Sequence, residues 1–410
     1  MNNFEITFPK RFLWGAGTSA YQVEGNNANS DWWDWETTTK RPEPSGLACR
    51  HYELYDSDFD LIQSLHHNCH RLSIEWSRVE PEEGYFSDHE IRHYEDVIKA
   101  LKRRGIEPVV TLHHFTNPLW FARLGGWENK DARKYYSRYV EQIVDVLSPH
   151  VRFWVTINEP MVYAYYSYLA GLWPPQKKSF GLAMKVADTL ALAHIDAYGR
   201  IHAIYKRKNF PAPLVSIAQN IRSFVRKNAS FKNQAGAFAR DYLFNQRLIK
   251  NLLHTKSLDF LGVNYYTRDV VDVRSWSPAS FLSDVHKTDP AEIKKNSLGW
   301  DVYPEGLLDN LLHLKKYQLP IFILENGICT HDDNERWEFI QAHLKCVHDA
   351  MKKGAPVMGY LYWSLLDNYE WADGYAPRFG LVDVDYTTFK RTVRDSAKKY
   401  AQVCKSGILK

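Results

Sequence analysis

The sequence of 410 residues lacks the marks of several specialised classes of protein. No apolar run approaches the roughly 18 residues that cross a membrane, so we expect no membrane span. No basic region followed by an apolar core stands near the start, so we expect no secretory signal. Long Gly-, Ser- or Pro-rich linkers are also missing. These absences favour a single cytoplasmic domain over residues 1–410, although the length alone would allow two or three domains.

Cysteine usage and net charge indicate no disulfide framework, metal site or nucleic-acid partner. The 5 cysteines are an odd number without CxxC spacing, and there is no HExxH motif, so we expect reduced thiols and no metal. A net charge of +4 is small for this length and does not favour nucleic-acid binding. We expect no cofactor, and the oligomeric state stays open.

The sequence does contain a regular alternation of two kinds of segment. Short β-rich runs occupy residues 11–18, 70–76, 107–114, 151–158, 214–220, 258–266, 320–326 and 357–366. Stretches with helical spacing include residues 54–67, 89–104, 131–148, 183–207, 334–353 and 391–403. Eight buried strands separated by helices predict a parallel α/β sheet, and eight strands can close a barrel. We therefore predict a single (β/α)8 TIM barrel, with residues 272–298 as its longest loop.

Polar residues follow most of the predicted strands. Glu159 lies in TINEP after the fourth strand, and Glu325 lies in ILENG at the end of the seventh. Either carboxylate alone could equally cap the next helix. Active sites of such barrels lie at the carboxyl ends of the strands, so the two carboxylates can face each other across the barrel mouth.

Two opposed carboxylates in different environments suit the hydrolysis of a glycosidic bond. One remains protonated and donates to the leaving oxygen, whereas the other remains ionised and attacks the anomeric carbon. Arg71 on the second strand could keep the attacking carboxylate charged, because a nearby cation lowers the pKa of an acid. A structural ion pair is an equal alternative for Arg71.

The aromatic content fits the same chemistry. Aromatic residues make up 14% of the chain, and sugars pack their C–H faces on aromatic rings. Most of these residues are expected in the core. Residues 362–386 differ because they combine Trp363, Trp371 and Phe379 with the acid Glu370. Gly374 and Pro377 in this run predict an exposed loop.

Eight segments in order along nearly the whole chain show a resemblance to one known family. They are FLWGAGTSAYQVEG (12–25), HRLSIEWSRVEPEEG (70–84), TLHHFTNPLWF (111–121), WVTINEP (154–160), FLGVNYYT (260–267), YPEGL (303–307), ILENG (323–327) and YWSLLDNYEWADGYAPRFGLVDVDY (362–386). The sequence resembles glycoside hydrolase family 1, the β-glucosidases and β-galactosidases, and most closely its archaeal and related bacterial branch. A single NEP or ENG motif would be weak evidence, whereas eight motifs in order are specific.

The resemblance implies a retaining exo-β-glycosidase that removes terminal β-D-glucosyl, and also galactosyl or fucosyl, units through a covalent glycosyl-enzyme. Glu159 would be the acid/base and Glu325 the nucleophile, with their carboxyl groups about 5–5.5 Å apart. Asn158 would bond the sugar's 2-hydroxyl, Tyr266 would hold Glu325, and Arg71 would lie beside it. The other implied sugar contacts are Gln22, His114, Trp363, Glu370, Trp371 and Phe379.

The chain also departs from the family pattern. It is shorter than usual, the stretches after the first and fourth strands look trimmed, and Phe115 stands where Trp is common. Loops over the barrel mouth shape the aglycone side, so these departures leave the aglycone open. Glu370 disfavours the 6-phospho-glycoside branch, and the intact TINEP disfavours the thioglucosidase branch.

Two other functions use the same residues. A sugar-binding barrel without turnover would keep the pocket, and a transglycosidase would keep the whole mechanism. The expected partners are small β-glycosides or oligosaccharides.

Overall fold

Eight parallel strands close into a barrel in the computed structural model, which describes residues 5–276 and 293–410. The barrel strands are β2 (Leu13–Gly17), β3 (Cys69–Ser73), β4 (Glu107–Thr111), β5 (Phe153–Asn158), β6 (Leu214–Asn220), β8 (Leu261–Asn264), β10 (Ile321–Asn326) and β11 (Val357–Trp363). The barrel closes because β10 pairs with β8 on one side and with β11 on the other, and β11 pairs with β2. Each predicted β-rich run overlaps one of these strands, so the predicted TIM barrel is confirmed.

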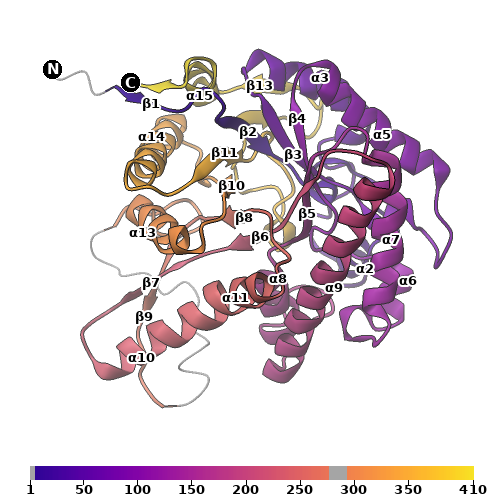
Figure 1. Ribbon diagram of the computed structural model, residues 1–410, viewed down its shortest axis with the longest axis horizontal. Coiled ribbons are helices and arrows are strands. Elements are labelled where there is room, and N and C mark those ends of the chain that lie inside the picture. The colour runs from indigo at the N-terminus through magenta and orange to yellow at the C-terminus, as the bar shows by residue number, and fades with distance from the viewer. Residues whose placement is uncertain (1–4, 277–292) are drawn as a thin grey trace.

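The helices surround the strands, as Figure 1 shows. The longer ones are α3 (His51–Ser64), α5 (Asp88–Arg103), α7 (Ala132–Leu147), α9 (Phe180–Arg207), α10 (Phe231–Arg240), α11 (Arg247–His254), α13 (Pro304–Leu314), α14 (Asp333–Lys352) and α15 (Asp395–Ser406). Shorter helices are α1 (Ala20–Val23), α2 (Asp31–Thr38), α4 (Trp76–Val79), α6 (Leu119–Arg123) and α8 (Pro160–Tyr163). Two π-helical segments, η2 (Ala164–Leu169) and η3 (Asp241–Gln246), follow α8 and α10. Single 3-10 turns are η1 (Gly126–Glu128), η4 (Lys315–Tyr317) and η5 (Trp371–Asp373).

Helix α5 shows how the sequence specifies these elements. The Ser87 hydroxyl accepts a hydrogen bond from the backbone of Glu90 and so satisfies a free N–H at the start of the helix. Lys102 and Arg103 in the last turn complement the helix dipole. The apolar stripe seen in the sequence is buried along the helix at Ile91, Tyr94, Val97, Ile98 and Leu101.

Within residues 5–276 and 293–410, three small two-stranded sheets lie outside the barrel. Strand β1 (Ile6–Thr7) pairs with β14 (Ile408–Leu409), which brings the two ends of the described chain together (Figure 1). Strands β7 (Ser223–Arg226) and β9 (Arg268–Val271) form a parallel pair that contacts α10. Strand β12 (Val382–Val384) pairs with β13 (Arg391–Val393).

The structure differs from one prediction, the helix over 391–403, and describes only part of another, the loop over 272–298. The helix predicted over 391–403 begins only at Asp395, because Arg391–Val393 pairs with β12 instead and Arg391 binds Asp58 on α3. In the loop predicted over 272–298, residues 277–292 lie outside the described residues, and 272–276 have no helix or strand.

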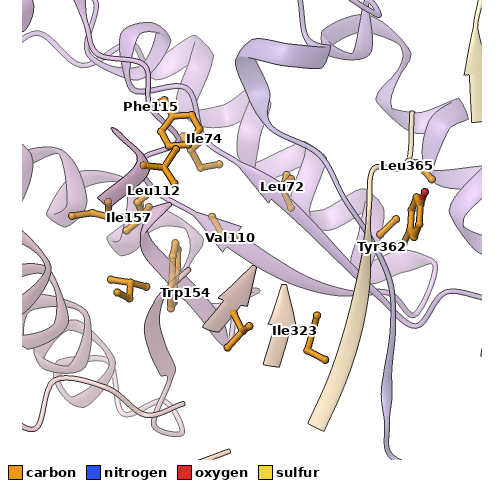
Figure 2. Close-up of a cluster of buried hydrophobic side chains, with 14 of the residues drawn as sticks. Leu72, Ile74, Val110, Leu112, Phe115, Trp154, Ile157, Ile323, Tyr362 and Leu365 are labelled. Carbon is orange, nitrogen blue, oxygen red and sulfur yellow. The ribbon is translucent and has the colours of Figure 1, made fainter. Parts of the chain in front are cut away.

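The apolar core has two layers because successive strand residues point to opposite faces. On β4, Val109 belongs to a cluster of strand side chains with Phe153, Phe322 and Leu361 inside the barrel. The neighbouring Val110 is paired with Trp154 on β5, and both belong to the larger cluster between strands and helices, as does Ile323 on β10 (Figure 2). Both layers hold the strand ends, and therefore the residues that follow them, in fixed positions.

Candidate active site

A cavity of about 1160 Å³, including its open mouth, lies at the carboxyl ends of the barrel strands. Glu159 and Glu325 both line it. Eight further residues singled out in the sequence also line it: Gln22, His114, Asn158, Tyr266, Trp363, Glu370, Trp371 and Phe379. Arg71 lies behind the cavity wall, where it contacts two of these residues. The structure therefore brings Glu159, Glu325 and these eight predicted residues together around one cavity.

Glu325, the last residue but one of β10, is held by a cation and a hydroxyl. The Arg71 guanidinium donates to Oε1 of Glu325, and the Tyr266 hydroxyl donates to Oε2 across 2.6 Å. Arg71 is fully buried and also donates to Asn158 at 2.7 Å and Thr111 at 3.0 Å. A side chain fixed at both oxygens cannot rotate away from the cavity, so the carboxylate is oriented before any ligand binds.

Glu159 sits directly after β5 in a backbone conformation that few non-glycine residues adopt. Its φ of 43° and ψ of 57° are left-handed, its N–H bonds to Ala218 at 2.7 Å, and Pro160 begins α8. Strain of this kind persists only where surrounding contacts enforce it, and it clusters at functional sites. The turn directs the side chain into the cavity instead of along the strand.

The surroundings of Glu159 favour its protonated form. Burial and, to a lesser extent, the negative charge of Glu325 together raise the pKa of Glu159 to about 7. Asn220 and Asn264 donate to the same oxygen, Oε1, at 2.8 and 2.9 Å, and partly oppose this rise. One carboxyl group that is protonated near neutral pH thus shares a cavity with a second carboxylate held by an arginine.

A network of polar groups also lines the cavity. The Gln22 amide donates to Glu370 at 3.2 Å and to the Tyr369 carbonyl at 2.9 Å. His114 contacts Asn158 through Nε2 at 3.2 Å, while its Nδ1 is buried with no partner. Burial also holds the pKa of His114 well below its ordinary value, so the ring is neutral. These groups can donate to and accept from several hydroxyls of one sugar ring.

The indole rings of Trp363 and Trp371 add apolar surface to the cavity beside these polar groups. His114 lies nearly parallel to Trp363, at 6.0 Å and 18°, and to Trp371, at 5.9 Å and 15°. Trp371 and Phe379 are 5% and 3% exposed, so the prediction of an exposed loop for this run is wrong. Tyr21, Trp32 and Trp173 from distant segments pack on Trp371. The burial of Trp371 therefore cannot be predicted from the local sequence.

Several residues that line the cavity were not predicted from the sequence. Asn220 lines it, donates to Glu159 and ends a barrel strand, so the strand-end pattern could have identified it. Asn264, at the end of β8, donates to the same oxygen of Glu159. Trp173 and Trp300 line the cavity from loops that have no such pattern.

Comparisons with known proteins agree with this geometry. Residues 4–253 and 228–408 match the model of the family described as Glycosyl hydrolase family 1. Beta-glucosidase A of Thermotoga maritima is 31% identical over 97% of this chain and 98% of its own, and a beta-galactosidase of Pyrococcus woesei is 29% identical over 95% of each. The solved structure of a beta-glycosidase from Pyrococcus horikoshii is 41% identical, with a TM-score of 0.92 over 99% of this chain and 97% of that one.

These matches cover nearly the whole chain, and the matched family is the one that the sequence motifs resemble. The relatives are named as glucosidase, galactosidase and glycosidase, all of which cleave β-glycosides. The chain belongs to glycosyl hydrolase family 1 and is a glycoside hydrolase of the β-glycosidase type.

Proposed function

We propose that this protein is a retaining exo-β-glycosidase that removes a terminal β-D-glucosyl unit through a covalent glycosyl-enzyme. The observation that supports this most strongly is the different environment of the two carboxyl groups. Burial and the charge of Glu325 keep Glu159 protonated to about pH 7, whereas Arg71 and Tyr266 hold Glu325 by both oxygens. One group can therefore give a proton while the other attacks.

In the first step, Glu325 attacks the anomeric carbon and Glu159 gives its proton to the leaving oxygen. The bond to the aglycone breaks and an ester to Glu325 forms. In the second step, Glu159 takes a proton from water, which attacks the same carbon and releases the sugar and Glu325. Asn158 is proposed to bond the 2-hydroxyl, and the contacts of its amide with Arg71 and His114 support this role.

The sugar contacts support a neutral hexose. Gln22, His114, Glu370 and Trp371 are proposed to hold its remaining hydroxyls, with Trp363 and Phe379 along its apolar face. Burial raises the pKa of Glu370 to about 8, which suits a hydroxyl partner and provides no cation for a phosphate. Glucosides are the proposed main substrates, and galactosides and fucosides are proposed as further ones. A relative named as a beta-glucosidase supports the glucosides, and one named as a beta-galactosidase supports the galactosides.

Domain organisation and location are part of the proposal. Residues 1–410 are proposed to form one domain, because cavity residues run from Gln22 to Phe379. All five cysteines are free, and four are buried, which suits a reducing compartment such as the cytoplasm. Among the described residues no helix has the length and apolar character of a membrane span.

Replacing the nucleophile tests the proposal. Glu325→Ala should lower kcat for an aryl β-D-glucoside by about 10³-fold or more, because no covalent intermediate can form. Azide should restore turnover and yield the α-glucosyl azide, since it enters the space left by the carboxylate. Glu338→Ala, which changes an exposed glutamate on α14, is the matched control and should retain full activity. Undiminished hydrolysis by Glu325→Ala would contradict the assignment.

A further inference from the structure

Two of the proposed sugar contacts, Glu370 and Trp371, lie on a tight turn that lines the active-site cavity. Residues 370–375, which include η5, form this turn. The Glu370 N–H bonds to the Gly374 carbonyl at 2.7 Å, and the Asp373 N–H bonds to the Glu370 carbonyl at 2.9 Å. Trp371 and Gly374 have left-handed backbones, with φ of 49° and 69°. For a tryptophan this conformation persists only where surrounding contacts enforce it.

A segment far away in the sequence supplies such contacts. The Arg41 guanidinium donates to the carbonyl of Ala372, 331 residues later. The Glu43 carboxylate accepts the Tyr375 N–H at 3.1 Å, and the Tyr375 hydroxyl donates to the Ser45 carbonyl. Three residues of one short segment therefore bond to the middle and the end of the 370–375 turn.

The 41–45 segment is itself fixed to α2. The Arg41 N–H bonds to the Glu36 carbonyl at 3.0 Å, and the Arg41 guanidinium lies 5.1 Å from the centre of the Trp35 ring. The N–H and the hydroxyl of Ser45 both donate to the Glu36 carboxylate at 2.8 Å. A segment fixed at both of its ends can hold the turn in one position.

The same support reaches the indole of Trp371. The Glu36 carboxylate also accepts the Tyr21 hydroxyl at 2.9 Å. The Tyr21 ring lies parallel to the Trp371 ring, at 5.8 Å and 6°. Glu36 and Tyr21 are each 1% exposed, so this link is buried throughout. Buried polar groups that are all paired rigidify the structure around them.

We propose that Arg41 is a positioning residue that sets how tightly Glu370 and Trp371 bind the sugar. This inference rests on the proposed function, in which these two residues hold hydroxyls of the terminal hexose. The carbonyl that Arg41 holds belongs to Ala372, next to Trp371 and two residues after Glu370. Binding groups need supporting contacts that hold them to within about 0.5 Å of the productive geometry. Loss of the Arg41 bond releases the turn and weakens recognition of these hydroxyls.

A series of deoxy sugars tests the inference. The substrates are 4-nitrophenyl β-D-glucoside and its 2-, 3-, 4- and 6-deoxy analogues. For each variant, kcat/KM of the parent is divided by kcat/KM of an analogue, so the fraction of folded enzyme cancels. Glu370→Ala first identifies the hydroxyl that Glu370 binds, because the ratio for the analogue lacking that hydroxyl falls.

Arg41→Ala should then change the same ratio. We expect it to lower the ratio for the hydroxyl that Glu370 binds by about fivefold or more. The ratio for the 2-deoxy analogue should change by less than about twofold, because Arg71 and not the 41–45 segment holds Asn158. An unchanged ratio for the Glu370 hydroxyl would overturn the inference, and so would a Glu370→Ala variant in which no ratio falls.

A double-mutant cycle shows whether Arg41 acts through Glu370. If it does, Arg41→Ala changes little in a protein that already lacks the Glu370 side chain. We expect the loss of kcat/KM in the double variant to be about fivefold smaller than the product of the two single losses. Arg41 also lines the cavity, so it could instead contact the substrate directly. A double loss equal to that product would indicate this independent contact and overturn the positioning role.

Two further variants separate positioning from a general loss of structure. Arg41→Lys keeps a donor for the Ala372 carbonyl and should regain most of the lost ratio. Arg104→Ala is the matched control, since Arg104 is also half-buried, donates to the carbonyl of Ala100 and pairs with Asp56 on α3. It should leave every ratio unchanged. Equal changes in Arg104→Ala and Arg41→Ala would overturn the inference.

Calorimetry separates a failure of this inference from a failure of the proposed function. Methyl 1-thio-β-D-glucoside resists hydrolysis, so its affinity reports binding alone. We expect Arg41→Ala to weaken its binding by about threefold or more, and to have little effect when Glu370 is already alanine. If the wild-type protein hydrolyses no glucoside, the proposed function fails. An unchanged affinity in Arg41→Ala would overturn the positioning role in either case.

Discussion

At the scale of single residues, the hydrogen bonds of Glu159 indicate which of its oxygens carries the proton. Asn220 and Asn264 both donate to Oε1, at 2.8 and 2.9 Å. An oxygen that accepts two N–H groups is not a favourable place for a proton of its own. The proton of the neutral acid therefore lies on Oε2, and the two amides act as positioning residues for proton transfer to the leaving oxygen.

Removing one of these amides should shift the pH profile in a defined direction. In the wild-type protein, kcat/KM for methyl β-D-glucoside should fall as the pH rises through about 7, because Glu159 must be protonated. The Asn220 bond stabilises the charged form, so Asn220→Ala should move this alkaline limb upward by about one pH unit. The pH dependence of kcat/KM, measured for the wild-type protein and for Asn220→Ala, gives the position of the alkaline limb in each.

A remote amide provides the control. Asn310 on α13 bonds Ser223 and Gly306 outside the cavity, and Asn310→Ala should leave the alkaline limb in place. An alkaline limb that stays at the same pH in Asn220→Ala would contradict the role assigned to Asn220.

The predictability of the site differs from residue to residue for physical reasons. Glu159 and Glu325 could be predicted because a polar residue at or directly after the carboxyl end of a buried strand must lie at the barrel mouth. The ring stacking on Trp371 could not, because Tyr21, Trp32 and Trp173 come from segments whose approach depends on the whole fold. The contact of Gln22 with Glu370, separated by 348 residues, is set by the pairing of β11 with β2.

At the scale of elements, local patterns locate the strands and long helices well but miss paired segments outside the barrel. The stripe on α5 has a helical period that needs no tertiary information. Arg391–Val393 was predicted as helix, and only its partner β12 makes it a strand. Strands β7 and β9 escaped prediction for the same reason, because each is four residues long and pairs with a distant segment.

Strand packing at the mouth leads to a prediction about Gly327, which follows the end of β10. A Cβ at this position would lie 1.9 Å from the backbone oxygen of Trp363 at the end of β11. Gly327→Ala should therefore force the two strand ends apart, lower the free energy of unfolding by about 2 kcal/mol or more, and reduce kcat as Glu325 moves. Urea unfolding and steady-state kinetics measure these two effects.

Gly199 on α9 is a matched position where the same glycine-to-alanine substitution should stabilise the protein. A Cβ there meets nothing within 4 Å, and the residue is exposed in a helix. Gly199→Ala should raise the free energy of unfolding by about 0.5–1 kcal/mol, because alanine favours the helix. Equal effects of the two substitutions would refute the packing argument.

At the scale of the whole molecule, buried ionisable groups predict a stability maximum near pH 6.5. Burial lowers the pKa of six histidines to about 3 or 4: His67, His70, His93, His113, His194 and His343. Burial raises the pKa of Asp31, Glu75 and Glu159 to about 7, and of Glu370 to about 8. Folding therefore changes the protons bound by both kinds of group.

The histidines and the carboxyl groups change the stability with pH in opposite directions. As the pH falls below about 6.5, the unfolded histidines bind protons that the folded ones refuse, so stability is lost. As the pH rises, the unfolded carboxyls ionise at lower pH than the folded ones, and their contribution is lost by pH 7 to 8. Below about pH 6.5 the effect of the six histidines outweighs that of the four acids. Above it most unfolded histidines have lost their protons, so the effect of the acids dominates.

Calorimetry across pH 5 to 8 tests this balance. We expect Tm to be highest near pH 6.5 and about 2–5 °C lower at either end of the range. A Tm that rises or falls steadily from pH 5 to pH 8 would show that other groups dominate.

The central claim is that Glu159 and Glu325 act as acid/base and nucleophile at the carboxyl end of the barrel, and that Glu325 forms the covalent intermediate. An activated 2-deoxy-2-fluoro-β-D-glucoside tests it most directly, because fluorine slows the second step and lets the glycosyl-enzyme accumulate. We predict that one fluoroglucosyl group is added per chain and that peptide mass spectrometry locates it on Glu325. A label on Glu159 or elsewhere, or turnover without any labelled chain, would contradict the account.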